Sequence, residues 1–297
     1  MTHEKIVAGT GYGVCDEYSP LRRVLVRRPG SEFTNMEQYR LWGYSGEPDL
    51  AQAQVEHDAF TAILKREGVE VIDQEQVHPK KREPLFTHDA SIMTPKGAIL
   101  CRSGNPLRRG EEEYASKAFE ALGIPVFFAV NGDGTVDGGD TLWLDPDTFL
   151  VGHSYRTNHE GYRQLRSAME GVVARRVIQV PLPHHIGPSH VLHLMSVISP
   201  VDRDLAVVYP RLAPIVLLEL LDERGIRWVE VPDEEFESMG PNVLAISPRN
   251  VVIHSGNPVT KSRLEDHGCH VHEYTGEQIS MIPCGGPTCL TRPILRG

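Results

Sequence analysis

One pattern recurs five times along this chain and limits what it can fold into: an amphipathic helical stretch, a glycine, and a β-rich run. The copies are LKREGVEVI, EALGIPVFF, SAMEGVVARRVIQV, LDERGIRWVEV and LEDHGCHVHEY, around Gly68, Gly123, Gly171, Gly225 and Gly268. Glycine readily adopts the left-handed conformation that ends a helix. Five copies at a spacing of roughly 50 residues favour a closed architecture built from repeated units around an axis.

The segments around these glycines carry the expected periodicities. Before Gly68, one predicted helix places a set of apolar residues on one face: Ala59, Phe60, Ile63 and Leu64. Short apolar runs between the helices predict strands at 23–29, 97–101, 148–152, 205–209 and 250–254. We therefore expect an α/β protein in which each repeat supplies strands and one covering helix.

The composition favours one globular domain. The chain has 297 residues, 40% of them hydrophobic and 24% charged, which is an ordinary balance for a protein with a sizeable core. No Ser/Gly-rich linker, charge block or shift in composition divides it. We expect a single domain over residues 1–297, with a central site lined by loops from several repeats.

Charge and hydropathy exclude some classes of partner. The formal net charge is -10, and no basic run is interleaved with aromatic residues, which argues against nucleic acid and anionic membranes as partners. The chain start has no signal-peptide pattern, and no stretch approaches the ~18 apolar residues of a membrane span. A cytoplasmic protein is expected. The five cysteines are odd in number and scattered, which favours reduced thiols over a disulfide framework.

Two residues are candidates for the central chemistry. Cys289 follows a Gly-Gly-Pro turn in IPCGGPTCLTRPI, and backbone amides of such a turn would lower the pKa of the thiol toward a reactive thiolate. His193 lies in LHLMS, just before a run of small and apolar residues. The alternative is that both are ordinary core residues, a small apolar cysteine and a hydrogen-bonded histidine.

Acidic and basic residues accompany this pair. Asp89 lies in FTHD, and Asp137 and Asp140 flank the double glycine of DGGD; by themselves these could be turn or cap residues. Arg108 and Arg109 open a predicted helix in NPLRRGEEE, and Arg156 precedes another in SYRTN. Because the helix macrodipole favours anions at that end, these arginines predict an anionic substrate group; solvated surface positions are the alternative.

A histidine cluster raises the question of a metal. His184, His185, His190 and His193 lie close together in the sequence, but no HExxH, paired CxxC or HxH-plus-carboxylate spacing accompanies them. A zinc hydrolase is therefore the weaker alternative. No metal and no organic cofactor is expected.

The motifs FTHD, NPLRRGE, DGGD, SYRTN, LHLMS and GGPTCLT, taken in this order, resemble the guanidino-group-modifying superfamily. Its members include dimethylarginine dimethylaminohydrolases, arginine deiminases and glycine amidinotransferases, and the resemblance to the first of these is closest. The resemblance runs from about residue 20 to the end of the chain. It implies a five-bladed pseudo-symmetric α/β propeller of the pentein type.

The resemblance also implies roles for individual residues. Cys289 would attack the guanidinium carbon to form a covalent thiouronium, and His193 would protonate the departing amine and then activate water. Asp137 would orient His193 or the substrate, and Asp89 would bind the guanidinium edge. The remaining predicted substrate-binding residues are Asp140 and two arginines matching positions that hold the substrate carboxylate, Arg108 and Arg156. A methylated or substituted arginine would give citrulline and an amine.

Two departures bear on the substrate. His88 stands where dimethylarginine enzymes tend to have Glu and deiminases Arg, and Met195 replaces an Asp of the deiminases and a Lys of the dimethylarginine enzymes. An apolar Met195 would tolerate an alkylated nitrogen, which favours a substituted arginine. The aromatic segment 33–49 is a candidate substrate lid, or else a structural loop.

Alternative functions remain open at this stage. An arginine deiminase-like or amidinotransferase activity on another guanidine would use the same residues for its first half-reaction. A non-catalytic ligand-binding protein that kept the fold belongs to a different class, and a binder need not retain Cys289, His193, Asp137 and Asp89 together. The sequence also leaves open a homo-oligomer and the role of Cys284.

Overall fold

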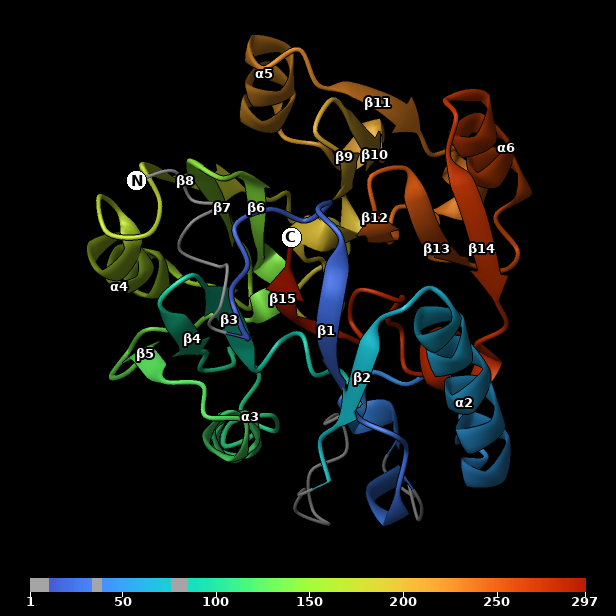
Figure 1. Cartoon of the computed structure of the whole chain (residues 1–297), viewed down its shortest axis with the longest axis horizontal. Helices are drawn as coiled ribbons and strands as arrows, with labels where there is room; N and C mark the ends of the chain where they lie inside the picture. Colours follow the sequence, from blue (N-terminus) through green and yellow to red (C-terminus); the bar gives the residue numbers. More distant parts are fainter. Residues whose placement is uncertain (1–10, 34–38, 76–84) are drawn as a thin grey trace.

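The computed structural model describes residues 11–33, 39–75 and 85–297. They form five three-stranded sheets arranged around a common centre (Figure 1). In spatial order the sheets are β15(Arg292–Arg296)-β1(Leu21–Val26)-β2(Glu70–Asp73); β3(Ser91–Thr94)-β4(Gly97–Leu100)-β5(Val126–Ala129); β6(Thr141–Asp145)-β7(Thr148–His153)-β8(Arg176–Pro181); β9(Ile198–Asp202)-β10(Leu205–Val208)-β11(Arg227–Glu230); and β12(Leu244–Ser247)-β13(Asn250–His254)-β14(His270–Tyr274).

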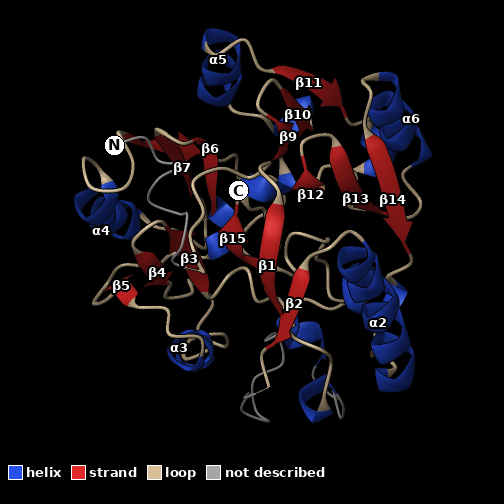
Figure 2. Ribbon diagram, in the orientation of Figure 1, coloured by secondary structure: helices blue, strands red, loops and turns tan. Residues whose placement is uncertain are grey.

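All five units have the same connectivity. The middle strand of each sheet pairs antiparallel with the first and parallel with the third. Because a parallel pair needs a crossover, one helix connects the middle strand to the third. These helices are α2(Leu50–Arg66), α3(Glu112–Ala121), α4(His159–Met169), α5(Ile215–Glu223) and α6(Pro258–Asp266). They lie around the outside of the ring of sheets (Figure 2). The predicted five-bladed α/β propeller is confirmed.

Each of the five repeat glycines is the second residue after the last residue of its helix, and its backbone is in the left-handed region. Their φ angles are 84° at Gly68, 68° at Gly123, 75° at Gly171, 64° at Gly225 and 78° at Gly268. An L-residue is strained there because its Cβ approaches the following carbonyl oxygen. The repeat is therefore a series of helix stops, each followed by the outer strand of a sheet.

The predicted strands coincide with the middle strands of the five sheets, β1, β4, β7, β10 and β13. The first ends at Val26, short of the predicted 29, where Pro29 has no backbone N–H to donate. On α2, Phe60, Ile63 and Leu64 are buried as predicted. Ala59 is exposed, so its assignment to the core face was wrong. Ala53 and the polar pair Glu56 and His57 complete that face instead.

The ring closes through its two ends. β15, the last strand of the chain, pairs antiparallel with β1, the first, with Val24 opposite Pro293 and Leu25 opposite Arg292. The backbone of Gly13 adds hydrogen bonds of 2.8 Å to Ile294 and 3.1 Å from Arg296. Figure 1 shows β15 beside β1 at the middle of the molecule. The sheet formed from both ends makes a single domain the natural organisation, which stays a prediction.

Short helical turns complete the described residues: η1(Ser31–Phe33), η2(Tyr39–Trp42), η3(Gly138–Asp140), η4(Leu194–Ser196), η5(Pro210–Leu212), η6(Asp233–Glu235) and the π-helical turn η7(Glu277–Met281). All five cysteines are free. Among the described residues, no helix combines the length and apolar character needed to cross a membrane.

We expect Gly225→Ala to lower the free energy of unfolding by about 1–2 kcal/mol, because a Cβ at this positive φ is strained although no neighbouring atom blocks it. Urea unfolding followed by circular dichroism measures the change. Gly46→Ala is the control, since Gly46 is outside the left-handed region and its nearest contact would be Ile282 at 4.0 Å. Equal effects of the two substitutions would contradict the helix-stop role of Gly225.

Candidate active site

One cavity of about 560 Å³ contains most of the predicted site residues. Cys289, His193, Asp137 and Asp89 line it, and so do the two predicted carboxylate-binding arginines, Arg108 and Arg156. The loops that form it come from all five sheets, as the closed ring requires. Asp140 does not line it.

Five polar side chains occupy equivalent places in the five units, each in the loop that enters the first strand of a sheet. Asp89 precedes β3, Asp137 precedes β6, His193 precedes β9, Asn242 precedes β12 and Cys289 precedes β15. The sequence analysis found four of these and missed Asn242, because MGPNV contains no recognisable chemical motif. Its place in the repeat is the signal that would have found it.

The double glycine of DGGD permits the close approach of three of these loops. A Cβ at Gly138 would collide with the carbonyl oxygen of His88, and one at Gly139 would collide with the His193 ring and lie 2.9 Å from Asp89 Oδ1. The Gly139 amide uses this proximity and donates to Asp89 Oδ1 at 2.9 Å. Glycine is needed here for space, since neither residue has a positive φ.

His193 lies between two carboxylates. Its Nε2 is 3.3 Å from Asp137 Oδ2, and its Nδ1 is 3.9 Å from Asp89 Oδ1. Burial alone would lower the pKa of His193, but the carboxylates of Asp89, Asp140 and Asp137 outweigh it and raise the pKa to about 9. At neutral pH the ring is therefore an imidazolium with both nitrogens protonated, the form that can donate a proton.

Asp137 is itself held by hydrogen bonds to two neighbouring loops. Its Oδ1 accepts from the Gly104 amide at 3.2 Å, and its own amide donates to Thr157 Oγ1 at 3.1 Å. Oδ2 remains for His193. Asp137 is thus positioned to orient the imidazolium, as the sequence predicts, while that role itself stays a prediction.

The Cys289 loop packs tightly against its neighbours. A Cβ at Gly285 would collide with the Phe86 ring, and one at Gly286 would collide with the Asn242 carboxamide. The His88 amide donates to the Cys289 carbonyl at 3.4 Å, and His88 Nδ1 is 2.9 Å from the Thr291 carbonyl. His88 thereby joins the nucleophile loop to the strand entry that carries Asp89.

Asn242 is oriented so that its amide group faces the thiol. Its Oδ1 accepts from both the backbone N and the Oγ1 of Thr288, at 3.0 and 2.9 Å. Because Oδ1 is used by two donors, the NH₂ group must point the other way, where Nδ2 donates to Cys289 Sγ at 3.6 Å. A donor in this position stabilises a thiolate.

The prediction of a lowered thiol pKa was wrong. Burial and the carboxylate of Asp89 raise the pKa of Cys289 to about 11. The Gly286 amide of the turn acts in the predicted direction, with help from Thr288 and Asn242, but these hydrogen bonds do not outweigh burial. Cys289 is therefore a thiol at neutral pH.

The predicted substrate-binding residues differ in their surroundings. Arg108 is buried and paired with Asp89 and Glu111, and it lies in the turns before α3 and does not open the helix as predicted. Arg156 lines the cavity with no ion pair to the residues that the structure describes. Asp140 accepts from Ser154 Oγ at 2.5 Å and from the Leu194 amide at 3.1 Å, which favours support of the His193 loop over direct substrate contact.

The structure does not support the two arguments about the substrate that were drawn from His88 and Met195. His88 and Met195 are 3% and 4% exposed, and neither lines the cavity. Burial lowers the pKa of His88 to about 3, with the nearby Arg292 acting in the same direction, so its ring is neutral. The inference that Met195 contacts an alkylated nitrogen therefore has no support in the geometry.

The residues that could bind a metal in the structure are not the histidine cluster considered in the sequence analysis. Within the described part of the chain, the group that could hold an ion is Asp89, Asp137 and His193, and the three ligand atoms lie within 4.8 Å of one another. Because the pKa of His193 is raised to about 9, an ion bound here would have to displace a proton from the ring at neutral pH, and both nitrogens of His193 face carboxylates. The arrangement fits a hydrogen-bonded cation better than a metal centre.

Part of the candidate lid borders the cavity. Residues 34–38 of the segment 33–49 lie outside the described residues, while the cavity lining includes Arg40, Leu41, Trp42 and Gly43.

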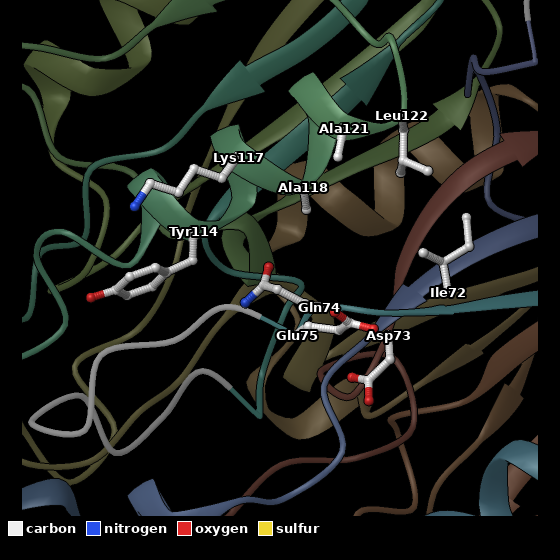
Figure 3. A pocket seen from close by; sticks show the side chains of 9 residues that line it. All are labelled: Ile72, Asp73, Gln74, Glu75, Tyr114, Lys117, Ala118, Ala121 and Leu122. Carbon is white, nitrogen blue, oxygen red and sulfur yellow. The ribbon is translucent and has the colours of Figure 1, made fainter.

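Cys284 also lines the cavity; it is exposed and has a φ of 59°. A second, smaller cavity of about 170 Å³ lies between the end of β2 and α3 (Figure 3). Its lining contains none of the predicted site residues.

Comparison with known proteins identifies a matching family and similar proteins. A model of the arginine deiminase family matches residues 82–215 and 213–296. The chain belongs to the arginine deiminase family. One relative is the N(G),N(G)-dimethylarginine dimethylaminohydrolase of Streptomyces coelicolor. It is 30% identical over 256 residues, which cover 84% of this chain and 88% of that protein. The relationship supports a guanidino-group hydrolase activity.

Solved structures of similar proteins confirm the fold of this arginine deiminase family member. A cysteine-to-serine variant of the dimethylarginine dimethylaminohydrolase from Pseudomonas aeruginosa, complexed with citrulline, has a TM-score of 0.75 at 23% identity and covers 94% of this chain and 100% of that one. An amidinotransferase from Microseira wollei has a TM-score of 0.77 at 16% identity and covers 96% and 97%.

We expect alkylation of Cys289 by iodoacetamide to be slow at pH 7 and to rise with pH toward about 11, because only the thiolate reacts. Asn242→Asp should shift this profile to higher pH, since it replaces a donor to sulfur with an acceptor. Peptide mass spectrometry separates Cys289 from the exposed Cys284. Asn250→Asp, in β13, is the matched control, and a shift of the same size in that variant would sink the assignment of Asn242.

Proposed function

We propose that this protein is a cysteine hydrolase of guanidino compounds that carry a carboxylate, with methylated or otherwise substituted arginine as the substrate class. The observation that carries the proposal is one cavity lined by the Cys289 thiol, the doubly flanked imidazolium of His193 and the carboxylate of Asp89. The products would be a ureido compound, citrulline in the case of an arginine, and an amine.

The electrostatics of the cavity suit a planar cation. A guanidinium is stabilised by resonance and is a poor electrophile, so its attack requires a thiolate, a carboxylate to hold it and an acid for the leaving group. The carboxylates of Asp89 and Asp137 provide anionic partners in a buried setting, where charge-assisted hydrogen bonds are strong.

Substrate charge also accounts for activation of the nucleophile. The pKa of Cys289 is raised to about 11 by burial and by Asp89. A guanidinium placed beside the sulfur favours the thiolate, and its pairing with Asp89 reduces the carboxylate's opposing effect. The thiol would thus lose its proton only when a cationic substrate occupies the cavity, which limits alkylation and oxidation of the empty enzyme.

His193 would act twice. The Cys289 thiolate attacks the guanidinium carbon, and the C–N bond breaks as the imidazolium gives its proton to the departing amine. The product of this half-reaction is a thiouronium on Cys289. The neutral imidazole then takes a proton from water as the hydroxide adds to the same carbon, and the C–S bond breaks to release the ureido product and regenerate Cys289.

The far end of the substrate would meet the arginines of the cavity. Arg156 lines it from the loop before α4 without an ion pair to the described residues, and Arg40 lines it from η2. A carboxylate on the substrate would be complementary to these charges. The 30% identity to the Streptomyces coelicolor dimethylarginine dimethylaminohydrolase supports a methylated arginine over other guanidino acids.

The proposal is tested with a panel of arginine, methylated arginines, agmatine and guanidino acids, each with and without an acceptor amine. We expect release of an amine and a ureido product, lost by on the order of 10³-fold or more in Cys289→Ala because that variant lacks the nucleophile. Liquid chromatography with mass spectrometry quantifies the products, and Cys284→Ala, at the same cavity, is the matched control.

The panel also separates the alternatives. Ammonia from unsubstituted arginine as the preferred reaction would indicate a deiminase, and transfer of the amidino group to the added amine would indicate an amidinotransferase. Absence of product and of a Cys289 adduct with every compound would rule out the proposed hydrolase and favour a binding protein.

The pH dependence of kcat/KM should be bell-shaped, with limbs near the pKa of about 9 for His193 and about 11 for Cys289. The reactive form combines a thiolate with an imidazolium, and it is a minor population because the pKa of His193 lies below that of Cys289. Asp137→Asn removes a charge that raises the pKa of His193, so the lower limb should move to lower pH and the maximum should fall. Initial rates from pH 6 to 11 measure both.

Asp133→Asn provides the control for this profile, because Asp133 is exposed and only its backbone carbonyl, not its side chain, is seen to make a hydrogen bond. Its limbs should coincide with those of the wild type. An unchanged lower limb in Asp137→Asn would show that Asp137 does not set the pKa of His193.

A further inference from the structure

The carboxylate proposed to bind the substrate's guanidinium already holds a guanidinium. Asp89 Oδ2 accepts from Arg108 Nη1 at 2.5 Å, and the two side chains are 6% and 5% exposed. The other oxygen, Oδ1, accepts from the Gly139 amide. Asp89 therefore has no free edge for a second guanidinium while Arg108 stays where it is.

Arg108 has one charged contact that could be kept if it left Asp89. Its Nε donates to Glu111 Oε2 at 2.9 Å, three residues further along the same segment. Nη2 donates to the Phe86 carbonyl at 3.3 Å, and this contact would be lost together with the one to Asp89, because the guanidinium is planar and rigid. Glu111 is 5% exposed. Arg108 could therefore turn about its bond to Glu111 and release Nη1 into the cavity that it lines.

The second arginine lies close to this segment. A Cβ at Gly104, four residues before Arg108, would collide with the Arg156 backbone, so the two loops touch. Both arginines line the same cavity. A carboxylate that docks at Arg156 is therefore delivered to the loop from which Arg108 projects.

Charge decides when Arg108 can move. Removing Arg108 from Asp89 without replacement leaves a buried carboxylate and a buried guanidinium each short of a partner, which is strongly unfavourable. A substrate with a guanidinium at one end and a carboxylate at the other replaces both partners at once. A guanidine without a carboxylate replaces only one of them.

Resting on the proposed function, we propose that Arg108 is a specificity switch that occupies the guanidinium site of Asp89 until a substrate carboxylate draws it away. The two ends of the substrate are then coupled: binding of the carboxylate opens the site for the guanidinium. Such a protein rejects guanidines without a carboxylate because Arg108 competes with them for Asp89, in addition to the missing contact with Arg156.

The test measures how tightly the cavity binds methylguanidine, which has no carboxylate, by isothermal titration calorimetry. All proteins carry Cys289→Ser, because a guanidinium beside the Cys289 sulfur would itself favour the thiolate. Arg108→Gln removes the internal competitor, so methylguanidine should bind more tightly by roughly 5- to 150-fold, the usual range of coupling between sites. Added propionate should strengthen binding of methylguanidine when Arg108 is present and have no such effect in Arg108→Gln. Nω,Nω-dimethylarginine should bind more weakly in the Arg108→Gln variant.

Two matched variants isolate the switch. Arg109→Gln changes the neighbouring arginine, which does not line the cavity, and should behave as the wild type. Arg156→Gln should weaken binding of dimethylarginine and leave binding of methylguanidine unchanged. A simple carboxylate-binding role for Arg108 would produce this same result in Arg108→Gln.

The outcomes separate this inference from the proposed function. If the wild type converts guanidines but methylguanidine binds Arg108→Gln no more tightly than the protein with Arg108, and propionate has no effect, the switch is refuted and the hydrolase stands. If no guanidine is converted and none binds in any variant, the proposed function itself fails.

Discussion

The pairing of β15 with β1 is the constraint on which the rest of this structure depends. It joins the last strand of the chain to the first and so closes five similar units into a ring. Cys289 lies in the loop that enters β15, so the same pairing brings the nucleophile to the centre. There the His88 backbone binds the Cys289 carbonyl and places the thiol beside Asp89, about two hundred residues away in sequence.

The closed ring determines how the site is assembled. Each unit contributes one polar side chain at the same place, the entry to its first strand, and the five meet because the loops converge on one cavity. Such convergence leaves little room, which is why Gly138, Gly139 and Gly286 stand where a Cβ would meet a neighbouring loop. Space at the centre, more than backbone conformation, explains those three glycines.

The centre holds charge that must be balanced. Asp89, Asp137 and Asp140 are buried around His193, which their charges keep protonated, and Arg108 forms an ion pair with Asp89. A buried carboxylate is tolerated only with partners. The same requirement links stability to function, because a cationic substrate can enter only by taking over a pairing that already exists.

The sequence alone determined the local features of this protein. Gly68 and its four counterparts predict the helix stops, and the short apolar runs between the helices predict the middle strands, because both depend on neighbouring residues. Motif order also predicted Cys289, His193, Asp137 and Asp89 as partners.

The tertiary structure alone decided how these groups behave. Burial raises the pKa of Cys289 against the turn amides, and Arg108 pairs with Asp89. His88 and Met195 do not line the cavity, and Asn242 joins the site. Each of these features depends on contacts between units that are distant in sequence. Closure of the ring sets the desolvation and charge pairing at those contacts, so no local sequence pattern predicts them.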